Sequence, residues 1–192
     1  LGIPIGILVN NVGCAYCPDE LCTQSEDLLW NIIYVNVGAI TLMSRIVIPQ
    51  MKKQGKGAIV NMASCAELQP LPLWAVYGAT KHYVRSLSLA MERELCAHNI
   101  SVQCVTPGFV STKIIQCPEN CSGKMFATPM ETYTRSAVFT LGKTQETTGY
   151  WTHAIMFFVA KLFPEWWRIR VFHIISDYTR KACLRDQLKG KE

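Results

Sequence analysis

The stretch from Ser64 to Lys81, SCAELQPLPLWAVYGATK, places a hydroxyl, a phenol and an ammonium group in a fixed order. Tyr77 and Lys81 stand four residues apart, so a helix that begins near Val76 brings both side chains to one face. A cation beside a phenol favours the phenolate and lowers the phenol pKa, which makes the group usable for proton transfer near neutral pH. Ser64 can donate a hydrogen bond to the same substrate oxygen. The stretch therefore predicts a proton-transfer site.

A tyrosine four residues before a lysine is not specific by itself. The chain has 7 tyrosines in 192 residues, and chance supplies roughly 0.4 such pairs in a chain of this composition. A half-buried tyrosine and a surface lysine on an ordinary helix explain the pair equally well. The other motifs of the chain decide between the two interpretations.

Those motifs resemble the short-chain dehydrogenase/reductase family over about residues 5 to 160. Asn10-Asn11-Val12-Gly13 follows an apolar run, as the family's Asn-Asn-Ala-Gly follows its fourth strand. Asn36 lies in a predicted helix, like the helix asparagine of the family. Pro107-Gly108-Phe109-Val110-Ser111-Thr112 corresponds to the family's Pro-Gly-x-x-x-Thr. The motifs occur in family order and at family spacing.

The resemblance implies a role for each matching residue. Tyr77 would pass the proton, Lys81 would lower its pKa and hold the ribose, and Ser64 would polarise the carbonyl. Asn36 would anchor a water in a proton relay. The implied cofactor-binding residues are Asn10, Tyr77, Lys81, Pro107, Gly108, Val110 and Thr112. NADP is favoured by resemblance alone and NAD is the other possibility, because the segment after the second strand that selects between them is not in the chain.

Within the family, Asn-Asn-Val-Gly resembles the 17-beta-hydroxysteroid dehydrogenase and very-long-chain 3-oxoacyl-CoA reductase branch. Ser25–Trp30, Thr147–His153 and Pro164–Trp167 are similar to its hydroxysteroid dehydrogenase-like group, some members of which lack the catalytic tyrosine and look inactive. This chain keeps Tyr77. The resemblance implies that a ketone and a secondary alcohol are interconverted on a lipid, either a 3-oxoacyl-CoA or a 17-ketosteroid, at the endoplasmic reticulum membrane, or in the mitochondrion as the alternative. A non-enzymatic lipid-binding or membrane-associated interaction protein, or a truncated inactive form, is the rival interpretation.

The apolar runs predict the fold. Runs bounded by turn residues are typical of strands buried on both faces of a parallel sheet. Strands are expected at residues 3–10, 58–63 and 100–105, and helices at about 25–53, capped by Ser25, and at about 74–98 and 132–141. The fold class is a Rossmann-like, doubly wound parallel α/β sheet. Residues 1–150 form the carboxyl-terminal part of that domain, and residues 151–192 form a helical extension.

The family's phosphate-binding Thr-Gly-x-x-x-Gly-x-Gly does not occur in these 192 residues. By resemblance, the first three strands and their helices precede Leu1 in a full-length relative. The strand at 3–10 would then be an exposed sheet edge, which favours aggregation. The cofactor pyrophosphate would also lose its helix N-terminus.

Composition bounds the remaining possibilities. Hydrophobic residues make up 49% of the chain and charged residues 17%, enough apolar material for one core. Neither a signal peptide nor a run of 18 or more apolar residues is found, so no spanning helix is expected. Of the net charge of +5, residues 160–192 carry eight basic minus four acidic side chains, or +4. Interleaved aromatic and basic residues in 151–192 predict an interfacial helical hairpin on a membrane surface.

Other partners follow from the same patterns. A helix packed on the body of the protein or on a second subunit is the alternative for residues 151–192. No nucleic-acid motif occurs in the sequence, and no nucleic-acid partner is expected. The resemblance implies a homodimer through the helices that carry Asn36 and Tyr77, because these form the dimer face in many family members.

The 9 cysteines are odd in number, and Cys96 and Cys104 fall in expected core segments. Reduced thiols in an intracellular protein fit this pattern better than disulfides. Cys14-x-x-Cys17 and Cys117-x-x-x-Cys121 would lie at one sheet edge, where a zinc site is conceivable. No histidine joins that spacing, so loop thiols beside a pocket are the preferred interpretation and no metal is predicted.

Overall fold

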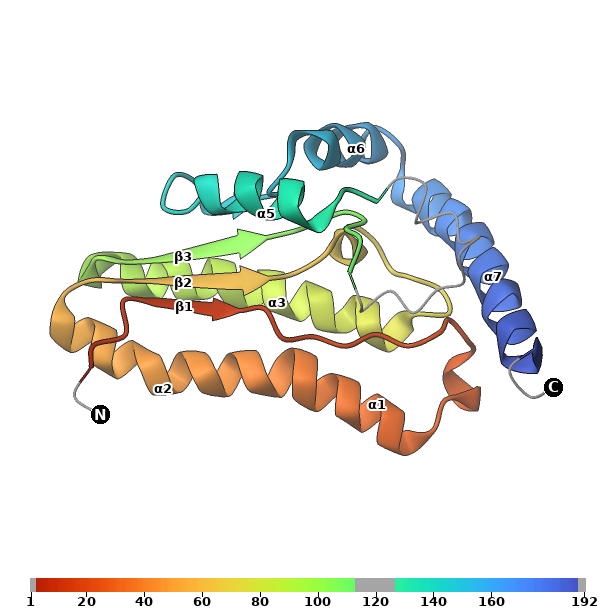
Figure 1. Ribbon diagram of the computed structural model, residues 1–192, viewed down its shortest axis with the longest axis horizontal. Coiled ribbons are helices and arrows are strands. Elements are labelled where there is room, and N and C mark those ends of the chain that lie inside the picture. Colours follow the sequence, from red (N-terminus) through yellow and green to blue (C-terminus); the bar gives the residue numbers. More distant parts are fainter. Residues whose placement is uncertain (1–2, 113–126, 190–192) are drawn as a thin grey trace.

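The computed structural model describes residues 3–112 and 127–189. Within them, four parallel strands form one sheet in the order β1-β2-β3-β4 (Figure 1). The strands are β1 Ile7–Asn10, β2 Gly57–Met62, β3 Ile100–Val105 and β4 Glu146–Thr147. The main helices are α1 Glu26–Ile33, α2 Ala39–Gln54, α3 Ala75–Leu95, α5 Met130–Phe139, α6 Trp151–Lys161 and α7 Glu165–Lys189. Short helical turns are η1 Leu21–Thr23, η2 Tyr34–Gly38, η3 Cys65–Glu67 and η4 Cys96–His98.

Alternation along the central strands assigns the two faces of the sheet. On one face, Ile59 of β2 and Val102 of β3 pack with residues of α2 and α3, including Met51. On the other face, Val60 and Val105 pack with Tyr133 of α5. Helices therefore cover both faces of β2 and β3, as a doubly wound parallel sheet requires. The predicted fold class is confirmed.

The first strand is shorter and more open than the sequence indicates. It comprises only Ile7–Asn10 rather than residues 3–10. Ile7 and Val9 are 53% and 56% exposed, so the strand is not buried on both faces. It pairs with β2 alone among the described strands. The expected two-sided burial is thus wrong for this strand, whereas the expected open edge is what the structure shows.

The helix predicted at about 25–53 consists of α1, a π-helical turn η2 at Tyr34–Gly38, and α2. The Ser25 hydroxyl accepts a hydrogen bond from the Leu28 N–H and caps the helix, as expected. By length and composition, Glu26–Gln54 is apolar enough to cross a membrane, contrary to the expectation from the sequence. Its inward residues lie about one turn apart along the sheet side: Ile32, Asn36, Ile40, Ser44, Val47 and Met51. That pattern is typical of a helix packed on a domain core.

The last two helices lie at the end of the sheet to which the strands point. Figure 1 shows α7 running past the carboxyl ends of β2 and β3, with α6 above α5. Pro164 separates α6 from α7, as the sequence indicates. Arg180 of α7 pairs with Asp19 at 2.6 Å, in the loop that follows β1. This ion pair joins α7 to the loop beside the candidate site.

Candidate active site

A cavity of about 630 Å³ opens at the carboxyl ends of the strands. Parallel sheets place their ligand sites at this end. The cavity brings Ser64, Tyr77 and Lys81 together with Gly108 and Thr112. The sequence motifs around Ser64 and Pro107, separated by over forty residues, therefore meet in one pocket.

Helix α3 presents Tyr77 and Lys81 on one face in its first two turns, as the four-residue spacing predicts. The Lys81 Nζ lies 5.8 Å from the centre of the Tyr77 ring. It donates a hydrogen bond to the Met62 carbonyl at 3.1 Å. Lys81 is 7% exposed, so its ammonium is a nearly buried cation beside the pocket.

Burial controls the pKa values of this pair. It raises the pKa of Tyr77 to about 12, against a smaller lowering by the Ser64 hydroxyl. It also lowers the pKa of Lys81 to about 8. The Tyr77 pKa is thus raised overall in this structure, because loss of hydration is the largest influence on the phenol, and a lowering of that pKa by Lys81 stays a prediction. Tyr77 is a neutral phenol at physiological pH and can donate a proton.

Ser64 lies two residues after the end of β2 and caps the short turn η3. Its Oγ accepts a hydrogen bond from the Ala66 N–H at 3.2 Å, which fixes the hydroxyl beside the cavity. The Cys65 N–H donates to the Pro107 carbonyl at 2.8 Å. The loop that carries Ser64 is thus joined by the backbone to the turn that begins at Pro107.

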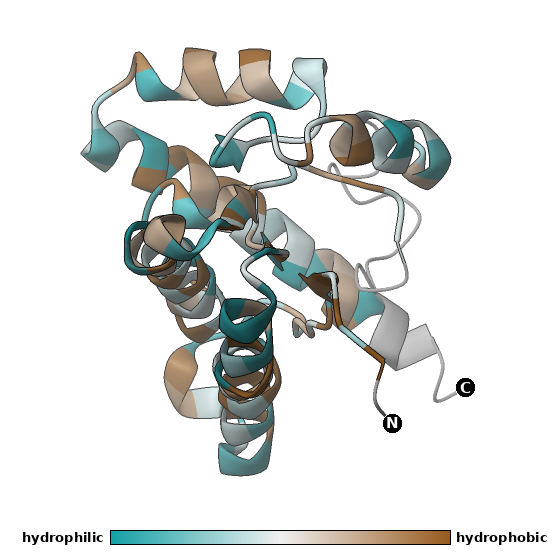
Figure 2. Cartoon of the chain, turned by 90° about the vertical axis from the view of Figure 1, so that its left-hand side faces the viewer, coloured by the Kyte–Doolittle hydropathy of each residue, from teal (hydrophilic) through white to brown (hydrophobic). Residues whose placement is uncertain are grey.

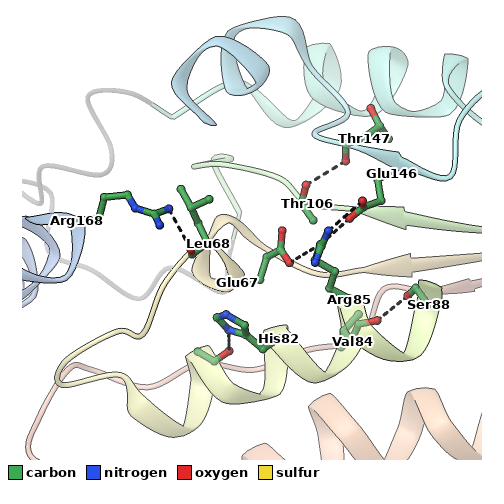
Figure 3. Close-up of polar contacts among 11 residues, drawn as sticks. Glu67, Leu68, His82, Val84, Arg85, Ser88, Thr106, Glu146, Thr147 and Arg168 are labelled. Atoms are coloured by element: carbon green, nitrogen blue, oxygen red, sulfur yellow. Dashed lines mark hydrogen bonds and ion pairs between the residues drawn. The ribbon is translucent and has the colours of Figure 1, made fainter. Parts of the chain in front are cut away.

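Ion pairs of Arg85 and a hydrogen bond from Arg168 connect the loop after Ser64 to two helices (Figure 3). Arg85 of α3 lies 3.1 Å from Glu67 and 2.6 Å from Glu146. From the other side, Arg168 of α7 donates to the Leu68 carbonyl at 3.2 Å. The loop is therefore connected both to the helix that carries Tyr77 and to the carboxyl-terminal helix.

Asn36 lies in the π-helical turn η2 and is 3% exposed. Its Oδ1 accepts from the Cys14 N–H at 2.9 Å, while its Nδ2 donates to the Cys14 carbonyl at 2.9 Å and the Thr80 hydroxyl at 3.1 Å. A buried amide requires such partners. These bonds fix the backbone of Cys14 at the pocket wall, next to α3. Single-turn π-helical insertions in α-helices are frequent at functional sites.

Asn10 ends β1, but its amide group points into the sheet layer. The Nδ2 donates to Asn61 Oδ1 at 2.8 Å and to Ser44 Oγ at 3.2 Å. Asn61 in turn donates to the Ser88 hydroxyl at 2.9 Å. This chain of polar contacts links β1 and β2 to α2 and α3. Both amide hydrogens of Asn10 are used there, whereas Val9 and Asn11 line the cavity.

The turn after β3, Pro107–Thr112, carries the other implied cofactor residues and is called the cofactor turn below. Pro107, Gly108, Val110 and Thr112 all line the cavity. Val110 is 8% exposed and forms a parallel bridge with Thr128. A Cβ on Gly108 would lie 2.8 Å from Met156 Cε and 2.9 Å from His153 Cδ2. Glycine is therefore required there by close packing.

These residues fit the nicotinamide and ribose end of a dinucleotide. Lys81 offers ammonium hydrogens at the wall, and the cofactor turn offers backbone groups and a hydroxyl. A Cβ on Gly13 would lie 3.4 Å from Asn36 Oδ1 and 3.6 Å from Lys81 Nζ, so glycine leaves the wall open in front of both polar groups. The donor set suits hydroxyl and carboxamide oxygens.

The model of the short chain dehydrogenase family matches residues 3–119. The chain belongs to this family. Hydroxysteroid dehydrogenase-like protein 1 of Gallus gallus is 42% identical over 84% of the chain and 50% of its own length. The Homo sapiens protein named inactive hydroxysteroid dehydrogenase-like protein 1 is 40% identical over 94% of the chain and 55% of its length.

Two further relatives are named as reductases. The very-long-chain 3-oxoacyl-CoA reductase of Rattus norvegicus is 38% identical over 98% of the chain and 61% of its own length. The crystal structure of 3-ketoacyl-(acyl-carrier-protein) reductase from Brucella melitensis with NADH has a TM-score of 0.66 at 27% identity, over 76% of this chain and 64% of that one. The chain thus spans about half to three fifths of the curated relatives it matches. The expected family is confirmed.

Two parts of the site were not predicted from the sequence. Helix α7 lines the cavity through Phe172, Ile175 and Thr179; an interfacial hairpin was the first expectation for residues 151–192, and packing on the body of the protein was the alternative. His153 contacts both the cofactor turn and Thr128, whereas in the sequence it stands out only as part of the family-like segment Thr147–His153. The signal available was the run Thr147–His153, which combines a turn glycine, an aromatic pair and a histidine.

One of the two cysteines that were expected to lie in the core is exposed instead. Cys104 is buried, as predicted, but Cys96 is exposed because it begins the turn η4 at the end of α3. Cys14, Cys17 and Cys65 are reduced thiols that line the cavity. Cys117 and Cys121 lie outside the described residues; among residues 3–112 and 127–189, no group of three or more metal-ligating side chains is found.

Proposed function

We propose that the chain carries the catalytic centre of an NAD(P)-dependent oxidoreductase that reduces a ketone on a lipid substrate to a secondary alcohol. The observation that carries this proposal is the meeting of Ser64, Tyr77 and Lys81 in the cavity that also contains the cofactor turn. Membership of the family supports the reaction class. The names of the reductases among the relatives support a substrate with a ketone on an acyl chain.

Tyr77 is the proton donor in this scheme. When bound, a reduced nicotinamide supplies the hydride to the carbonyl carbon. The carbonyl π-bond breaks, and the oxygen takes the Tyr77 hydroxyl proton as it becomes an alkoxide. A phenol with a pKa of about 12 remains protonated until it meets such a base. Ser64 donates a second hydrogen bond to the same oxygen.

Lys81 and the cofactor turn hold the cofactor in the same scheme. The Lys81 ammonium would bind the ribose hydroxyls, while backbone groups at Val110 and the Thr112 hydroxyl would bind the carboxamide. Pro107 and Gly108 shape that turn.

Two asparagines position the backbone that surrounds the same site. Asn10 holds β1 in place through its bonds to the sheet layer. Asn36 positions Cys14 and takes part in returning a proton to Tyr77 through a bound water. We favour NADP over NAD by resemblance to the reductase branch, and the described residues would hold the nicotinamide half that the two cofactors share.

The cavity wall supports a lipid substrate. Apolar side chains dominate it, from the loop before α3, from α5 and the turn that follows it, and from α7. The contributors are Leu71, Trp74, Met130, Val138, Leu141, Phe172 and Ile175. Burying an acyl chain or a steroid ring against such a wall is favourable by about 25 cal/mol per Å² of apolar area.

The test is a nicotinamide titration of the 192-residue protein, followed by turnover. Quenching of tryptophan fluorescence by NADPH should saturate, and should weaken when Tyr77→Phe is combined with Lys81→Ala. Oxidation of NADPH should then depend on a 3-oxoacyl-CoA or a 17-ketosteroid. A soluble, folded chain that shows no saturable binding contradicts the proposal for this chain and supports a non-enzymatic lipid-binding protein.

A membrane surface is a second proposed partner, favoured by the exposed aromatic residues of α6 and α7. Trp151, Phe158 and Trp166 are 64%, 66% and 68% exposed. Figure 2 shows apolar colours along the middle of α6, which lies at the outer end of the molecule. Such a surface suits the endoplasmic reticulum membrane, with the mitochondrion as alternative. Liposome flotation should fall for Phe158→Ser with Trp166→Ser, and unchanged flotation would remove this partner.

A homodimer is the remaining proposed assembly. The outer faces of α1 and α2 expose Trp30, Leu42, Met43 and Ile46, and the Tyr83 hydroxyl of α3 lies 2.8 Å from that of Thr41. An apolar face across neighbouring helices suits a second copy. Sedimentation should show a dimer that Ile46→Lys dissociates. A wild-type monomer at every concentration tested would contradict the assembly.

A further inference from the structure

The imidazole of His153 contacts two segments: Gly108 of the cofactor turn, and Thr128, which pairs with Val110 of that turn. Its Nδ1 accepts a hydrogen bond from the Gly108 N–H at 3.2 Å. Its Nε2 lies 3.1 Å from the Thr128 hydroxyl. His153 is 3% exposed, on the first turn of α6. One buried side chain therefore connects the segment before Val110 with the segment that pairs with it.

Backbone hydrogen bonds also join the two segments that His153 contacts. The Thr128 N–H donates to the Phe109 carbonyl at 2.9 Å, and the Ser111 N–H donates to the Thr128 carbonyl at 3.0 Å. Val110 lies between them and lines the cavity. A shift of the His153 ring would thus move the backbone that faces the pocket.

The hydrogen bond to Gly108 sets the protonation state of the ring. An amide N–H is only a donor, so Nδ1 must carry a lone pair and no proton. The neutral ring then has its hydrogen on Nε2, from where it donates to Thr128 Oγ1. Protonation of Nδ1 would place two N–H groups against each other and open the turn.

The surroundings favour the neutral ring. Tyr133 of α5 and Tyr150 are the titratable side chains whose rings pack against it, with centres 5.5 Å and 5.8 Å away. Burial lowers the pKa of His153, while the Phe109 and Thr148 carbonyls act in the opposite direction and only partly offset it. The ring therefore stays neutral at physiological pH.

We infer that His153, as the neutral Nε2–H tautomer, is the positioning residue that holds Gly108 and Val110 in the geometry that binds the nicotinamide carboxamide. This role rests on the proposed function, since it concerns the cofactor end of that site. His153 does not touch the reacting atoms; it acts through the backbone of the turn.

Three substitutions separate the contacts of the ring. His153→Asn keeps an acceptor near the Nδ1 position, whereas His153→Phe keeps the ring volume and loses both contacts. Thr128→Val removes only the Nε2 partner. Losing a buried hydrogen bond to the turn should weaken NADPH binding roughly tenfold in His153→Phe. His153→Asn should stay within about threefold of wild type, with Thr128→Val between them.

Two measurements on the cofactor-free chain decide the inference independently of the proposed function. Nitrogen-15 NMR of the histidines should show His153 as the Nε2–H tautomer at neutral pH. Amide exchange of Gly108, expressed as protection relative to the intrinsic rate at each pH, should be strongly protected in wild type and in His153→Asn but weakly protected in His153→Phe, and in wild type the protection should fall as the pH drops through the depressed pKa of His153. In His153→Asn that pH dependence should be lost. An Nδ1–H tautomer, or slow Gly108 exchange in His153→Phe, overturns the inference.

Failures of the two proposals are distinguishable. If neither wild type nor any variant binds NADPH, the proposed function fails, and tautomer and exchange still decide whether His153 holds the turn. If wild type binds NADPH and His153→Phe binds it equally well, the positioning role fails while the proposed function stands.

Discussion

The reacting end of the pocket and the turn that faces it differ in how their polar groups are satisfied. Lys81 is a nearly buried cation whose Nζ donates to one carbonyl, that of Met62. In the turn, by contrast, the Gly108 and Ser111 N–H groups and the Pro107 and Phe109 carbonyls all have partners. Groups proposed to meet the substrate keep unused hydrogen-bonding capacity at a cost in stability, whereas the groups that position them do not.

Among the substitutions considered, Tyr77→Phe should have the largest effect on the rate of ketone reduction. It removes the proposed proton donor and leaves the ring packing against Trp74, 6.5 Å away, in place. The rate of ketone reduction should fall by about 10²- to 10⁴-fold, the usual contribution of a general acid. Steady-state NADPH oxidation measures this. An equally active variant would show that another group supplies the proton.

Lys81→Met should raise stability at neutral pH, although it removes the ammonium proposed to bind the cofactor ribose. The folded-state pKa of Lys81 is about 8 and its ordinary value 10.5, so wild type gains stability as the pH rises between them. The gap between the two pKa values corresponds to at most about 3 kcal/mol at pH 7.

Urea unfolding at pH 7 and pH 10 tests this sign. The variant should be more stable than wild type at pH 7, and its advantage should shrink towards pH 10. Tyr77, whose folded pKa is about 12 against 10, acts oppositely only above pH 10 and does so in both proteins. A variant that is less stable at pH 7 would mean that the Met62 contact outweighs burial of the charge.

Gly108→Ala tests the satisfied turn. The added Cβ would meet Met156 Cε at 2.8 Å and His153 Cδ2 at 2.9 Å. The methionine end can move, but the imidazole is held at both nitrogens, so the variant should lose about 1–3 kcal/mol of stability. Gly38→Ala is the matched control, since no atom lies within 4 Å of its Cβ position. Equal stability of the two variants would show that the turn adapts.

Arg85→Gln should have the smallest effect. Arg85 and Glu146 are 41% and 40% exposed in their side chains, whereas Glu67 is 9% exposed. Exposed ion pairs contribute about 1 kcal/mol or less. A loss of this size that shrinks with added salt is expected, measured by thermal unfolding, with Arg93→Gln as an exposed control. A loss above about 2 kcal/mol would indicate that the buried carboxylate of Glu67 dominates.

Local patterns predicted much of the fold. The central strands and α3 lie within a few residues of their expected bounds, because apolar runs and turn residues act over short distances. The length and exposure of β1 were not predictable, since they depend on which neighbours cover it. The two-residue strand β4 has no local signal and exists through its pairing with Cys104 and Val105.

In the candidate site, too, local sequence motifs predicted some features, whereas others depend on contacts between distant residues. The motifs identified Ser64, Tyr77 and Lys81, and the structure brings them into one cavity. Spacing could not give the pKa of Tyr77, because that depends on how deeply the folded chain buries the phenol. Nor could it find His153, whose contacts with Gly108 and Thr128 span 45 and 25 residues.

The π-helical turn at Tyr34–Gly38 also sets the rotational register of the helix on either side of it. One residue more than an ordinary turn is accommodated there, so Ile32 and Ile40 both face the sheet, with Asn36 between them. Deleting a single residue from this turn would restore regular α-helix with both halves still facing the sheet, but it would remove the wide turn that carries Asn36. The wide turn is therefore a local addition to the helix, and a one-residue deletion within it should disturb the bonds between Asn36 and Cys14 while the apolar contacts of Ile32 and Ile40 stay in register.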